Sequence, residues 1–165
     1  ILYNKKRKKI CFITSSRADY GHQEPLMKLV KNNKNFIFQF IITGTHFSKD
    51  FGETYKQIIK DGFKPSAKIP LTGKLKTKKD IIYSMNKISR NFFQIINKLK
   101  PDIIVIFGDR FEILSCAEVA LINQIPMAHI GGGDITEGSY DDCIRHCLTK
   151  MSSLHFPTNN ISQLS

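Results

Sequence analysis

The strongest constraint on the fold is an alternation of short apolar segments with longer helical patterns. Four segments rich in Ile, Val and Phe and bounded by turn residues are typical of buried parallel strands, at 9–14, 36–43, 102–108 and 126–130. Helix-like patterns occupy 23–33, 49–61, 79–99, 112–123 and 141–152. This order predicts an α/β fold with an open, mostly parallel sheet, right-handed crossovers and helices on both faces.

The segment 79–99 carries the clearest helical signal. Its apolar residues recur at the i, i+3, i+4 spacing of an amphipathic helix, at Ile81, Ile82, Met85, Ile88, Phe92, Ile95, Ile96 and Leu99. Pro101 disfavours helical backbone at Lys100, so we expect the helix to end there. A weaker strand is expected within 66–71, and 71–77 is expected to form a mobile loop because it offers little to bury.

Length and charge limit the classes of protein to consider. A chain of 165 residues, 41% hydrophobic, suits one domain, which we place at 9–165 after a basic tail at 1–8. The formal net charge of +11 favours an anionic partner such as a nucleotide or a phosphate. Solvated helix faces are the simpler explanation of the lysine runs. No aromatic residues interleave with those lysines, so we expect no nucleic-acid partner.

The cysteines and the apolar runs bear on the compartment. Cys11, Cys116, Cys143 and Cys147 lack the regular spacing of a disulfide framework, so we expect reduced thiols in a cytoplasmic protein. Cys143 and Cys147 with His146 lack a second ligand pair at zinc spacing, and we predict no metal and no cofactor. No apolar run approaches the ~20 residues that span a bilayer, and no signal peptide is evident; we expect no membrane partner and no export.

Polar segments follow each predicted strand. In open α/β sheets, ligands bind beyond the carboxyl ends of the strands. The segments in question are 15–22, 44–52, 108–112 and 131–142. The strand ends at Ser15, Thr43, Gly108 and Ile130 should therefore share one edge of the sheet.

The segment after the first strand has two interpretations. Ser16 or Asp19 could cap a helix by accepting backbone N–H bonds. Arg17 beside a helix N-terminus is also an arrangement that binds phosphate. The Walker A pattern and the G-x-G-x-x-G pattern are absent after this strand, so neither usual phosphate-binding fingerprint applies.

Taken together, these segments identify a family resemblance. The matching residues, in order, are Arg17 to Tyr20, Gly44 to His46, Phe51-Gly52 with Thr54-Tyr55, Gly108 to Arg110, His129 with its glycines, and Asp141-Asp142 with Arg145-His146. From about Lys9 onward the chain resembles the hydrolysing UDP-N-acetylglucosamine 2-epimerases of sialic acid and related nonulosonic acid synthesis. The resemblance implies the Rossmann-like N-terminal lobe of a two-lobed GT-B architecture, without the C-terminal lobe that carries most nucleotide contacts.

The resemblance also implies a reaction and its catalytic residues. The C2 proton of the UDP-sugar is removed and UDP is lost to give a 2-acetamidoglucal; water then adds to give free N-acetylmannosamine or a related sugar. The proton needs a positioned base, and the departing diphosphate oxygen needs positive charge or an acid. Asp109 and Asp141 match catalytic carboxylates of the family. Asp134, Glu137 and His129 are further catalytic candidates.

A larger set of residues is implied to bind the substrate. These are Arg17, Tyr20, Gly21, His46, Arg110, Gly132, Gly133, Arg145, His146 and His155. Arg17 and Arg110 would face the diphosphate, and the glycines would let the backbone approach a sugar ring. His129 and His155 are equally consistent with hydrogen-bonded core histidines. A UDP-sugar partner and a homodimer of the full-length protein are implied as well.

One position departs from the family pattern. The family commonly has a glutamate two residues after the strand histidine, where this chain has Gly131. Three interpretations stay open: a carboxylate relocated to Asp134 or Glu137, a branch with a different substrate, or an impaired enzyme. For the segment 127–142, a flexible loop with a helix-capping Asp141 is the structural alternative.

Other functions also stay open. They are a non-hydrolysing epimerase, a GT-B glycosyltransferase lobe, and a non-catalytic Rossmann-like nucleotide-binding module. With only one lobe present, we expect negligible epimerase activity and weak UDP binding from the isolated chain.

Overall fold

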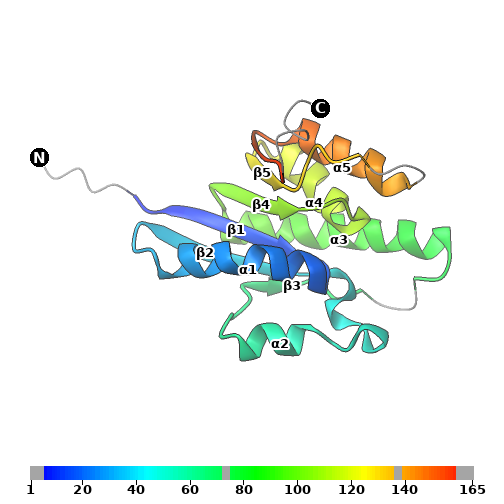
Figure 1. Cartoon of the computed structure of the whole chain (residues 1–165), viewed down its shortest axis with the longest axis horizontal. Helices are drawn as coiled ribbons and strands as arrows, with labels where there is room; N and C mark the ends of the chain where they lie inside the picture. Colours follow the sequence, from blue (N-terminus) through cyan, green and yellow to red (C-terminus); the bar gives the residue numbers. More distant parts are fainter. Residues whose placement is uncertain (1–5, 72–74, 136–138, 159–165) are drawn as a thin grey trace, which may run out of the picture.

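A computed structural model describes residues 6–71, 75–135 and 139–158. In these ranges six parallel strands form one sheet with the order β3-β2-β1-β4-β5-β6 (Figure 1). The strands are β1 (Lys8–Thr14), β2 (Phe36–Ile42), β3 (Ala67–Lys68), β4 (Ile103–Phe107), β5 (Met127–Ile130) and β6 (Leu154–Phe156). The first strand therefore begins at Lys8, one residue inside the segment expected to be a tail.

Helices cover both faces of the sheet, as the alternation predicts. The α-helices are α1 (Arg17–Asn32), α2 (Tyr55–Lys60), α3 (Lys78–Leu99), α4 (Phe111–Ile122) and α5 (Tyr140–Met151). Buried residues of α1 and α2 pack in one apolar cluster, and those of α3, α4 and α5 pack in another. The predicted Rossmann-like α/β fold is confirmed. Among the described helices, none is long and apolar enough to cross a membrane.

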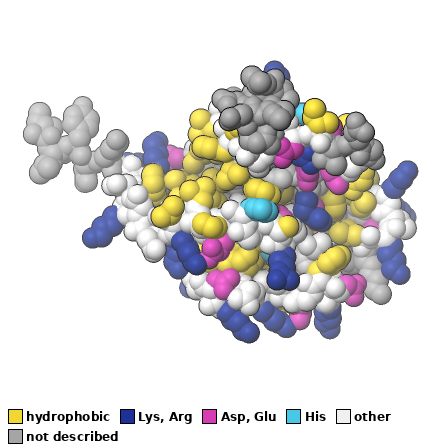
Figure 2. Space-filling view, in the orientation of Figure 1, with side chains coloured by type: hydrophobic (Ala, Val, Ile, Leu, Met, Phe, Trp, Pro, Cys, Tyr) yellow, Lys and Arg dark blue, Asp and Glu magenta, His cyan; other side chains and the backbone are white. Residues whose placement is uncertain are grey.

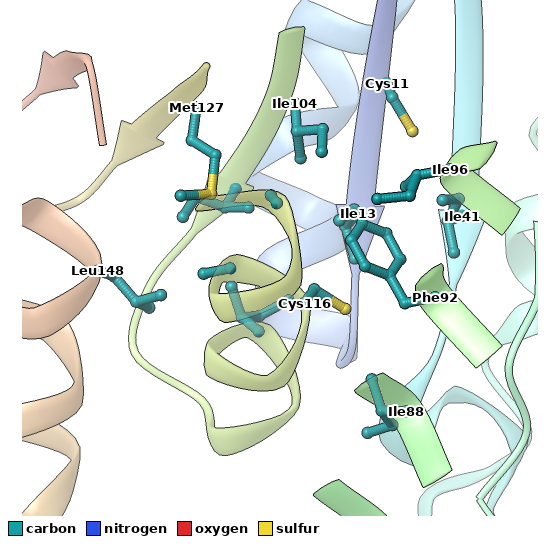
Figure 3. Close-up of a cluster of buried hydrophobic side chains, with 14 of the residues drawn as sticks. Cys11, Ile13, Ile41, Ile88, Phe92, Ile96, Ile104, Cys116, Met127 and Leu148 are labelled. Carbon is teal, nitrogen blue, oxygen red and sulfur yellow. The ribbon is translucent and has the colours of Figure 1, made fainter. Parts of the chain in front are cut away.

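The two clusters follow from the two-residue period of the strands. Within β1, Ile13 faces α3 and α4, whereas Phe12 faces α1 and α2. Figure 3 shows the first cluster, in which three side chains of α3 reach the strand residues: Ile88, Phe92 and Ile96. All three are buried, so they are the face of the amphipathic pattern that meets the sheet.

The ends of α3 agree with the sequence prediction. The helix begins with a capping box in which Thr77 and Asp80 bond each other's backbone N–H groups. It ends at Leu99, and Lys100 takes the left-handed conformation with φ of 48°. The restriction that Pro101 places on Lys100 explains this end.

The helix after the first strand begins earlier than predicted. It starts at Arg17 rather than at residue 23, because Ser16 and Asp19 form a capping box at its N-terminus. Pro25 lies inside this helix. The interpretation of this segment as a helix cap is thus confirmed, and the bonds of Ser16 and Asp19 determine where α1 begins.

The prediction of one continuous helix over 49–61 is wrong. It contains a 3-10 turn, η2 (Lys49–Phe51), which follows another, η1 (Gly44–Phe47), and only then the short helix α2. Gly52, with φ of 75°, ends η2 in the left-handed region and separates it from α2.

Two strands differ from the prediction at the sheet margins. β3 within 66–71 is only two residues long, and β6 was not predicted. The three residues of β6 are exposed, so they lack the apolar burial by which the inner strands are recognised. The loop expected over 71–77 lies partly outside the described residues.

The strand ends share one edge, as predicted. All pairings are parallel, and the last residues of neighbouring strands align, Thr14 with Ile42 and Phe107 with Ile130. The chain leaves β1 toward β2 and later returns to place β4 on the other side of β1. The ends of β1 and β4 therefore form the switch point where ligands bind in such sheets.

Candidate functional site

The turn after β1 is organised around the buried carboxylate of Asp19. Its Oδ2 accepts bonds from Ser15 N at 2.8 Å, Ser15 Oγ at 2.8 Å and Ser16 N at 3.0 Å. Burial raises the pKa of Asp19, whereas these bonds and the charge of Arg110 oppose that shift. Asp19 thus shapes the turn from within, and Arg17 beside it is exposed at the first position of α1.

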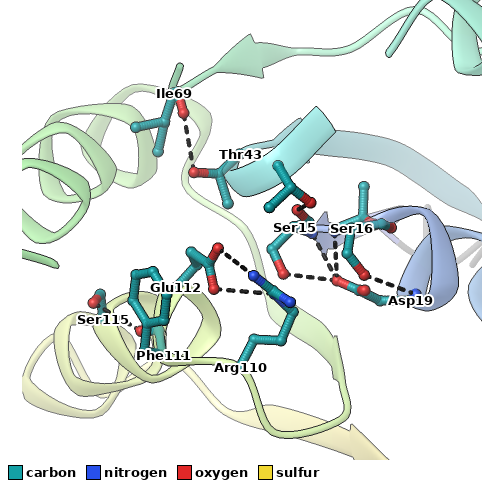
Figure 4. A network of polar contacts seen from close by, with 11 residues as sticks. Ser15, Ser16, Asp19, Thr43, Ile69, Arg110, Phe111, Glu112 and Ser115 are labelled. Carbon is teal, nitrogen blue, oxygen red and sulfur yellow. Dashed lines mark hydrogen bonds and ion pairs between the residues drawn. The ribbon is translucent and has the colours of Figure 1, made fainter. Parts of the chain in front are cut away.

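Arg110, just after β4, faces this turn and is held by Glu112. The guanidinium donates from Nε to Glu112 Oε2 at 3.1 Å and from Nη2 to Oε1 at 2.9 Å. Figure 4 shows Arg110 between Glu112 and the turn of Ser15 and Asp19. Glu112 is fully buried, and burial raises its pKa while the guanidinium opposes the shift. A bidentate pair of this kind fixes the plane of the guanidinium.

His46 is buried behind the same edge. Its Nε2 lies 3.0 Å from Thr14 Oγ1 and its Nδ1 lies 2.7 Å from Thr54 Oγ1. Burial lowers the pKa of His46 to about 4, and the charge of Arg110 acts in the same direction. At neutral pH the ring is therefore uncharged, and it joins β1 to the segment that precedes α2.

Arg145 of α5 joins three segments at the outer part of the edge. Its Nη2 donates to the Asp109 carboxylate, and its Nη1 donates to the backbone carbonyl of Asp134 at 2.6 Å. Nη1 also lies 3.6 Å from Asp142 Oδ1. Arg145 thus orients the candidate catalytic carboxylate of Asp109 rather than standing free for a ligand.

His129 is tied into the fold through both ring nitrogens. Nε2 lies 2.8 Å from Gly108 O, so it carries the hydrogen and donates it; Nδ1 lies 3.0 Å from Thr149 Oγ1. Burial lowers the pKa of His129, partly offset by its bond to Gly108. This geometry is that of a hydrogen-bonded core histidine linking β4, β5 and α5.

The glycines after β5 meet internal packing demands. A Cβ on Gly132 would lie 2.6 Å from Thr149 Oγ1 and 2.9 Å from His129 Nδ1. Gly131 has φ of 77°, in the left-handed region. A glutamate at 131 would have to adopt this conformation, which costs an L-residue about 1–2 kcal/mol. The loop is therefore built for glycine at both positions.

Asp141 and its neighbours open helix α5. The helix is capped by Ser139, whose Oγ accepts from Asp141 N at 3.2 Å and donates to Asp141 Oδ2 at 3.1 Å. The cap is therefore Ser139, so the alternative in which Asp141 caps the helix is wrong. The carboxylate of Asp141 is close enough to attract the charge of Arg110 electrostatically. Asp141 thus lies within the field of Arg110, and its neighbour Tyr140 lines the same cavity as Arg110.

Other predicted residues lie farther from this group. The Tyr20 hydroxyl donates to Asp61 Oδ2 at 2.7 Å and its ring packs on Phe63, while Gly21 is exposed with open space around it. His146 is exposed, and its Nε2 lies 3.6 Å from Asp142 Oδ2. Glu137 lies outside the described residues.

Two cavities border the edge. One of about 640 Å³ is lined by Arg110, with Lys49, Lys76 and the rings of Phe47, Phe51 and Tyr140. Another of about 700 Å³ is lined by Gly132, Gly133, His146, Lys150 and His155. The carboxylate of Asp134 accepts from Thr158 Oγ1 at 3.1 Å. The first cavity combines cations with aromatic and apolar walls, which suits an anionic ligand with a ring.

Sequence reasoning assigned no role in the site to Glu112, Thr54 or Thr149, although Thr54 and Glu112 lie in segments that it singled out. Glu112 immediately follows the "GDRF" segment in the first turn of a helix, two residues from an arginine. An acid at a helix position that must face the core needs a cationic partner. That rule would have indicated that Glu112 pairs with Arg110. The threonines carry no comparable signal, because only the packed structure places them against histidine nitrogens.

The surface charge and the cysteines add no further site. Figure 2 shows Lys and Arg spread around this face of the molecule, with acidic side chains among them. All four cysteines are free, with Cys11 and Cys116 buried. In the described part of the chain, no group of three or more His, Cys, Asp or Glu side chains is placed to hold a metal.

Comparison with known proteins decides the family. The UDP-N-acetylglucosamine 2-epimerase family model matches residues 28–164. The chain belongs to this family. Its α/β sheet is the N-terminal lobe of the GT-B architecture of these epimerases.

Individual relatives of this epimerase family give the same result. The chain is 41% identical over 155 residues to a GDP/UDP-N,N'-diacetylbacillosamine 2-epimerase (hydrolyzing) of Campylobacter jejuni, covering 94% of this chain and 40% of that protein. It is 31% identical over 156 residues to a UDP-N-acetylglucosamine 2-epimerase of Neisseria meningitidis serogroup B, covering 92% and 39%. The chain thus spans about two fifths of the length of these relatives.

A solved epimerase structure shares the fold. The UDP-GlcNAc 2-epimerase from Neisseria meningitidis bound to UDP-GlcNAc matches with a TM-score of 0.81 at 18% identity, covering 94% of this chain and 42% of that one. At this identity the match bears on the fold alone. It confirms the fold expected from the family resemblance.

Proposed function

We propose that the full-length protein is a hydrolysing 2-epimerase of a nucleotide-linked 2-acetamido sugar. The observation that carries this proposal is the grouping of Asp109 and Asp141 with Arg110 and Arg145 at the switch-point edge of the sheet. Carboxylates suit removal of the C2 proton, and a guanidinium suits the diphosphate oxygen that departs.

The reaction assigns each group a task. Asp109 or Asp141 takes the C2 proton, the C1–O bond breaks with its electron pair on the diphosphate, and UDP leaves a 2-acetamidoglucal. Water then adds, with its hydroxyl at C1 and a proton at C2, to release the free sugar. Arg17 begins the helix after β1 and Arg110 lies just after β4, so these two cations are proposed to meet the diphosphate.

The sugar is proposed to be a UDP-linked 2,4-diacetamido-trideoxy sugar, with UDP-N-acetylglucosamine as the second candidate. The higher identity to the diacetylbacillosamine epimerase, 41% against 31% for the UDP-N-acetylglucosamine epimerase, supports this order. The product would serve synthesis of a sialic or legionaminic type of acid. Among the interpretations of Gly131, a branch with a different substrate then gains support.

Product analysis of the full-length protein tests this function. Each substrate is incubated with the enzyme, and NMR follows release of free sugar and UDP. Free sugar with inverted C2 is the expected product. A nucleotide-linked product with inverted C2 would instead indicate the non-hydrolysing reaction, and transfer to an acceptor would indicate a glycosyltransferase.

The isolated chain is proposed to lack most of this activity. It spans about two fifths of its relatives, and the remainder of such a protein would carry much of the nucleotide site. We expect UDP to bind this chain weakly in calorimetry and sugar release to be negligible. Micromolar UDP affinity for the 165-residue chain would show that its nucleotide site is built within this lobe.

The full-length protein is also proposed to act as a cytoplasmic homodimer, without a nucleic-acid or membrane partner. Exposed apolar side chains on α3 and α4 support self-association, namely Ile82, Tyr83, Phe93, Leu121 and Ile122. Light scattering of the full-length protein tests the oligomeric state. A monomer at micromolar concentration would contradict this part of the proposal.

A further inference from the structure

Glu112 is a buried carboxylate to which neither the family resemblance nor the proposed reaction assigns a task. Its side chain is fully buried in the first turn of α4, and both of its oxygens accept from Arg110, at 3.1 and 2.9 Å. A buried charge is costly unless paired, so this geometry depends on the arginine. The pair is local, since only Phe111 separates the two residues.

The pair leaves one edge of the Arg110 guanidinium available. Nε and Nη2 face Glu112, whereas Nη1 donates no hydrogen bond to any residue within 6–71, 75–135 or 139–158. Arg110 also lines the cavity of about 640 Å³, whose other lining residues include Gly44 and Thr45 after β2 and Phe111 after β4. Arg110 therefore borders a space large enough for a ligand and has Nη1 left to donate.

The surrounding acids make orientation necessary. Asp19 and Asp141 both attract Arg110 electrostatically, in addition to Glu112. Figure 4 shows Asp19 and Glu112 on two sides of the Arg110 guanidinium. An arginine held by charge alone would turn toward either of these carboxylates. Because three acids offset its charge, Arg110 can bind an anion well only through N–H groups that point at it.

We propose that Glu112 is the positioning residue that presents the Nη1 edge of Arg110 to a diphosphate oxygen of the substrate. By occupying Nε and Nη2, it keeps the guanidinium from pairing with Asp19 or Asp141. The contact between Arg110 and a diphosphate rests on the proposed function, since the diphosphate belongs to that substrate. The control of the Arg110 position by Glu112 does not depend on the proposed function.

Kinetics of the full-length enzyme provide the first test. Glu112→Gln keeps the shape but replaces one acceptor by an N–H group that faces the guanidinium. We expect kcat/KM to fall roughly 10- to 100-fold and UDP affinity to fall about 10-fold, because the diphosphate loses a charge-assisted bond. The matched control is Glu118→Gln, the same change on the same helix at an exposed residue that bonds Ser89 Oγ. It should leave both values unchanged.

A double-mutant cycle separates positioning from a merely structural role. If Glu112 acts through Arg110, then Glu112→Gln should cause less than a ~2-fold further loss in an Arg110→Met background. The double variant also removes the guanidinium that Glu112→Gln leaves without its carboxylate partner, so its stability should recover relative to Glu112→Gln without recovery of activity. If the loss of kcat/KM in the double variant equals the product of the fold losses in the two single variants, the proposal is overturned. Should Glu112→Gln fold poorly, Glu112→Asp keeps the charge with a shorter reach and should show the same dependence on Arg110.

A crystal structure of the Glu112→Gln protein distinguishes this inference from the proposed function. If wild-type enzyme releases no sugar from either substrate, the proposed function fails. The crystal structure of the variant still tests whether Glu112 positions Arg110. An Arg110 guanidinium turned toward Asp19 or Asp141 supports positioning. A guanidinium in its original place overturns it.

Discussion

Arg110 and Arg145 are both paired with carboxylates at the same edge of the sheet, but they are held in different ways. Arg110 pairs with Glu112, two residues away on the start of the same helix. Arg145 reaches from α5 to Asp109 after β4 and to the Asp134 carbonyl after β5. One contact is local in sequence, and the other connects positions up to 36 residues apart.

The difference separates two kinds of organisation. The Arg110 pair orients one side chain and needs no other element to form. The Arg145 contacts set the relative position of two loops that carry candidate catalytic carboxylates, Asp109 and Asp134. We therefore expect changes at Glu112 to alter the orientation of one cation, and changes at Arg145 to alter both the site and the stability of the lobe.

The largest effect is expected at the carboxylate that Arg145 orients. In the full-length enzyme, Asp109→Asn should lower turnover by ~100- to 10,000-fold, because it removes a proton-transfer group but preserves shape. UDP affinity should stay nearly unchanged in calorimetry. The control is Asp102→Asn at the other end of β4, where Asp102 accepts from Lys9 N at 2.8 Å. Turnover of Asp109→Asn within a few fold of wild type would remove Asp109 from the catalytic set.

Arg145 itself should affect two measurements at once. Arg145→Met leaves the Asp109 carboxylate without its guanidinium partner, so we expect a stability loss of about 2–4 kcal/mol by chemical denaturation. Turnover should fall as well, because Asp109 and the Asp134 loop lose their common contact. Arg145→Lys should retain only part of the wild-type stability and turnover, since an ammonium cannot reproduce the forked geometry of a guanidinium. If lysine restores both values fully, charge alone explains the role of Arg145.

A smaller effect is expected at the glycine loop beside Arg145. Gly132→Ala brings a Cβ against Thr149 Oγ1 and His129 Nδ1, so stability should fall by about 1–3 kcal/mol. Gly21→Ala is the matched control, because its Cβ would meet open space on helix α1 and should be neutral or stabilising. Thermal or urea unfolding of the two variants and the wild type measures these differences in stability. Equal stability of both would mean that the loop after β5 relaxes freely.

The smallest effect should be a pH dependence of stability that comes from His46, which lies within the electrostatic field of Arg110. The pKa of His46 falls from 6.5 to about 4 on folding, so the unfolded chain binds the proton more tightly between these values. Its stability contribution is complete above pH 6.5 and is lost as pH falls toward 4, by on the order of 1–2 kcal/mol between pH 7 and 5.

His46→Gln isolates this contribution. The variant removes the titrating ring, whereas Asp19 and Glu112 still titrate in both proteins. Urea unfolding at pH 7 and pH 5 should therefore show a shallower loss of stability in the variant. Identical losses in the two proteins would show that His46 is not buried as an uncharged ring.

Much of the fold could be predicted from residue patterns, and the exceptions have physical causes. Short apolar runs bounded by turn residues predicted the inner strands, because strands covered by helices on both faces bury nearly every side chain. The apolar stripe of 79–99 predicted α3, because one face of that helix packs on the sheet. The start of α1 was misplaced because a capping box, rather than apolar periodicity, begins that helix. β6 was missed because its exposed residues carry no burial pattern.

The sequence by itself determined that polar segments follow each strand and meet at one edge, since parallel strands place their carboxyl ends together. It also determined the family resemblance through Asp109, Arg110, Asp141 and Arg145. Only the tertiary structure decided how these side chains are used within the lobe. It occupies both nitrogens of His129, turns Tyr20 toward Asp61 and pairs Arg145 with Asp109. Such pairings depend on distances between segments far apart in the chain, which no local pattern of residues encodes.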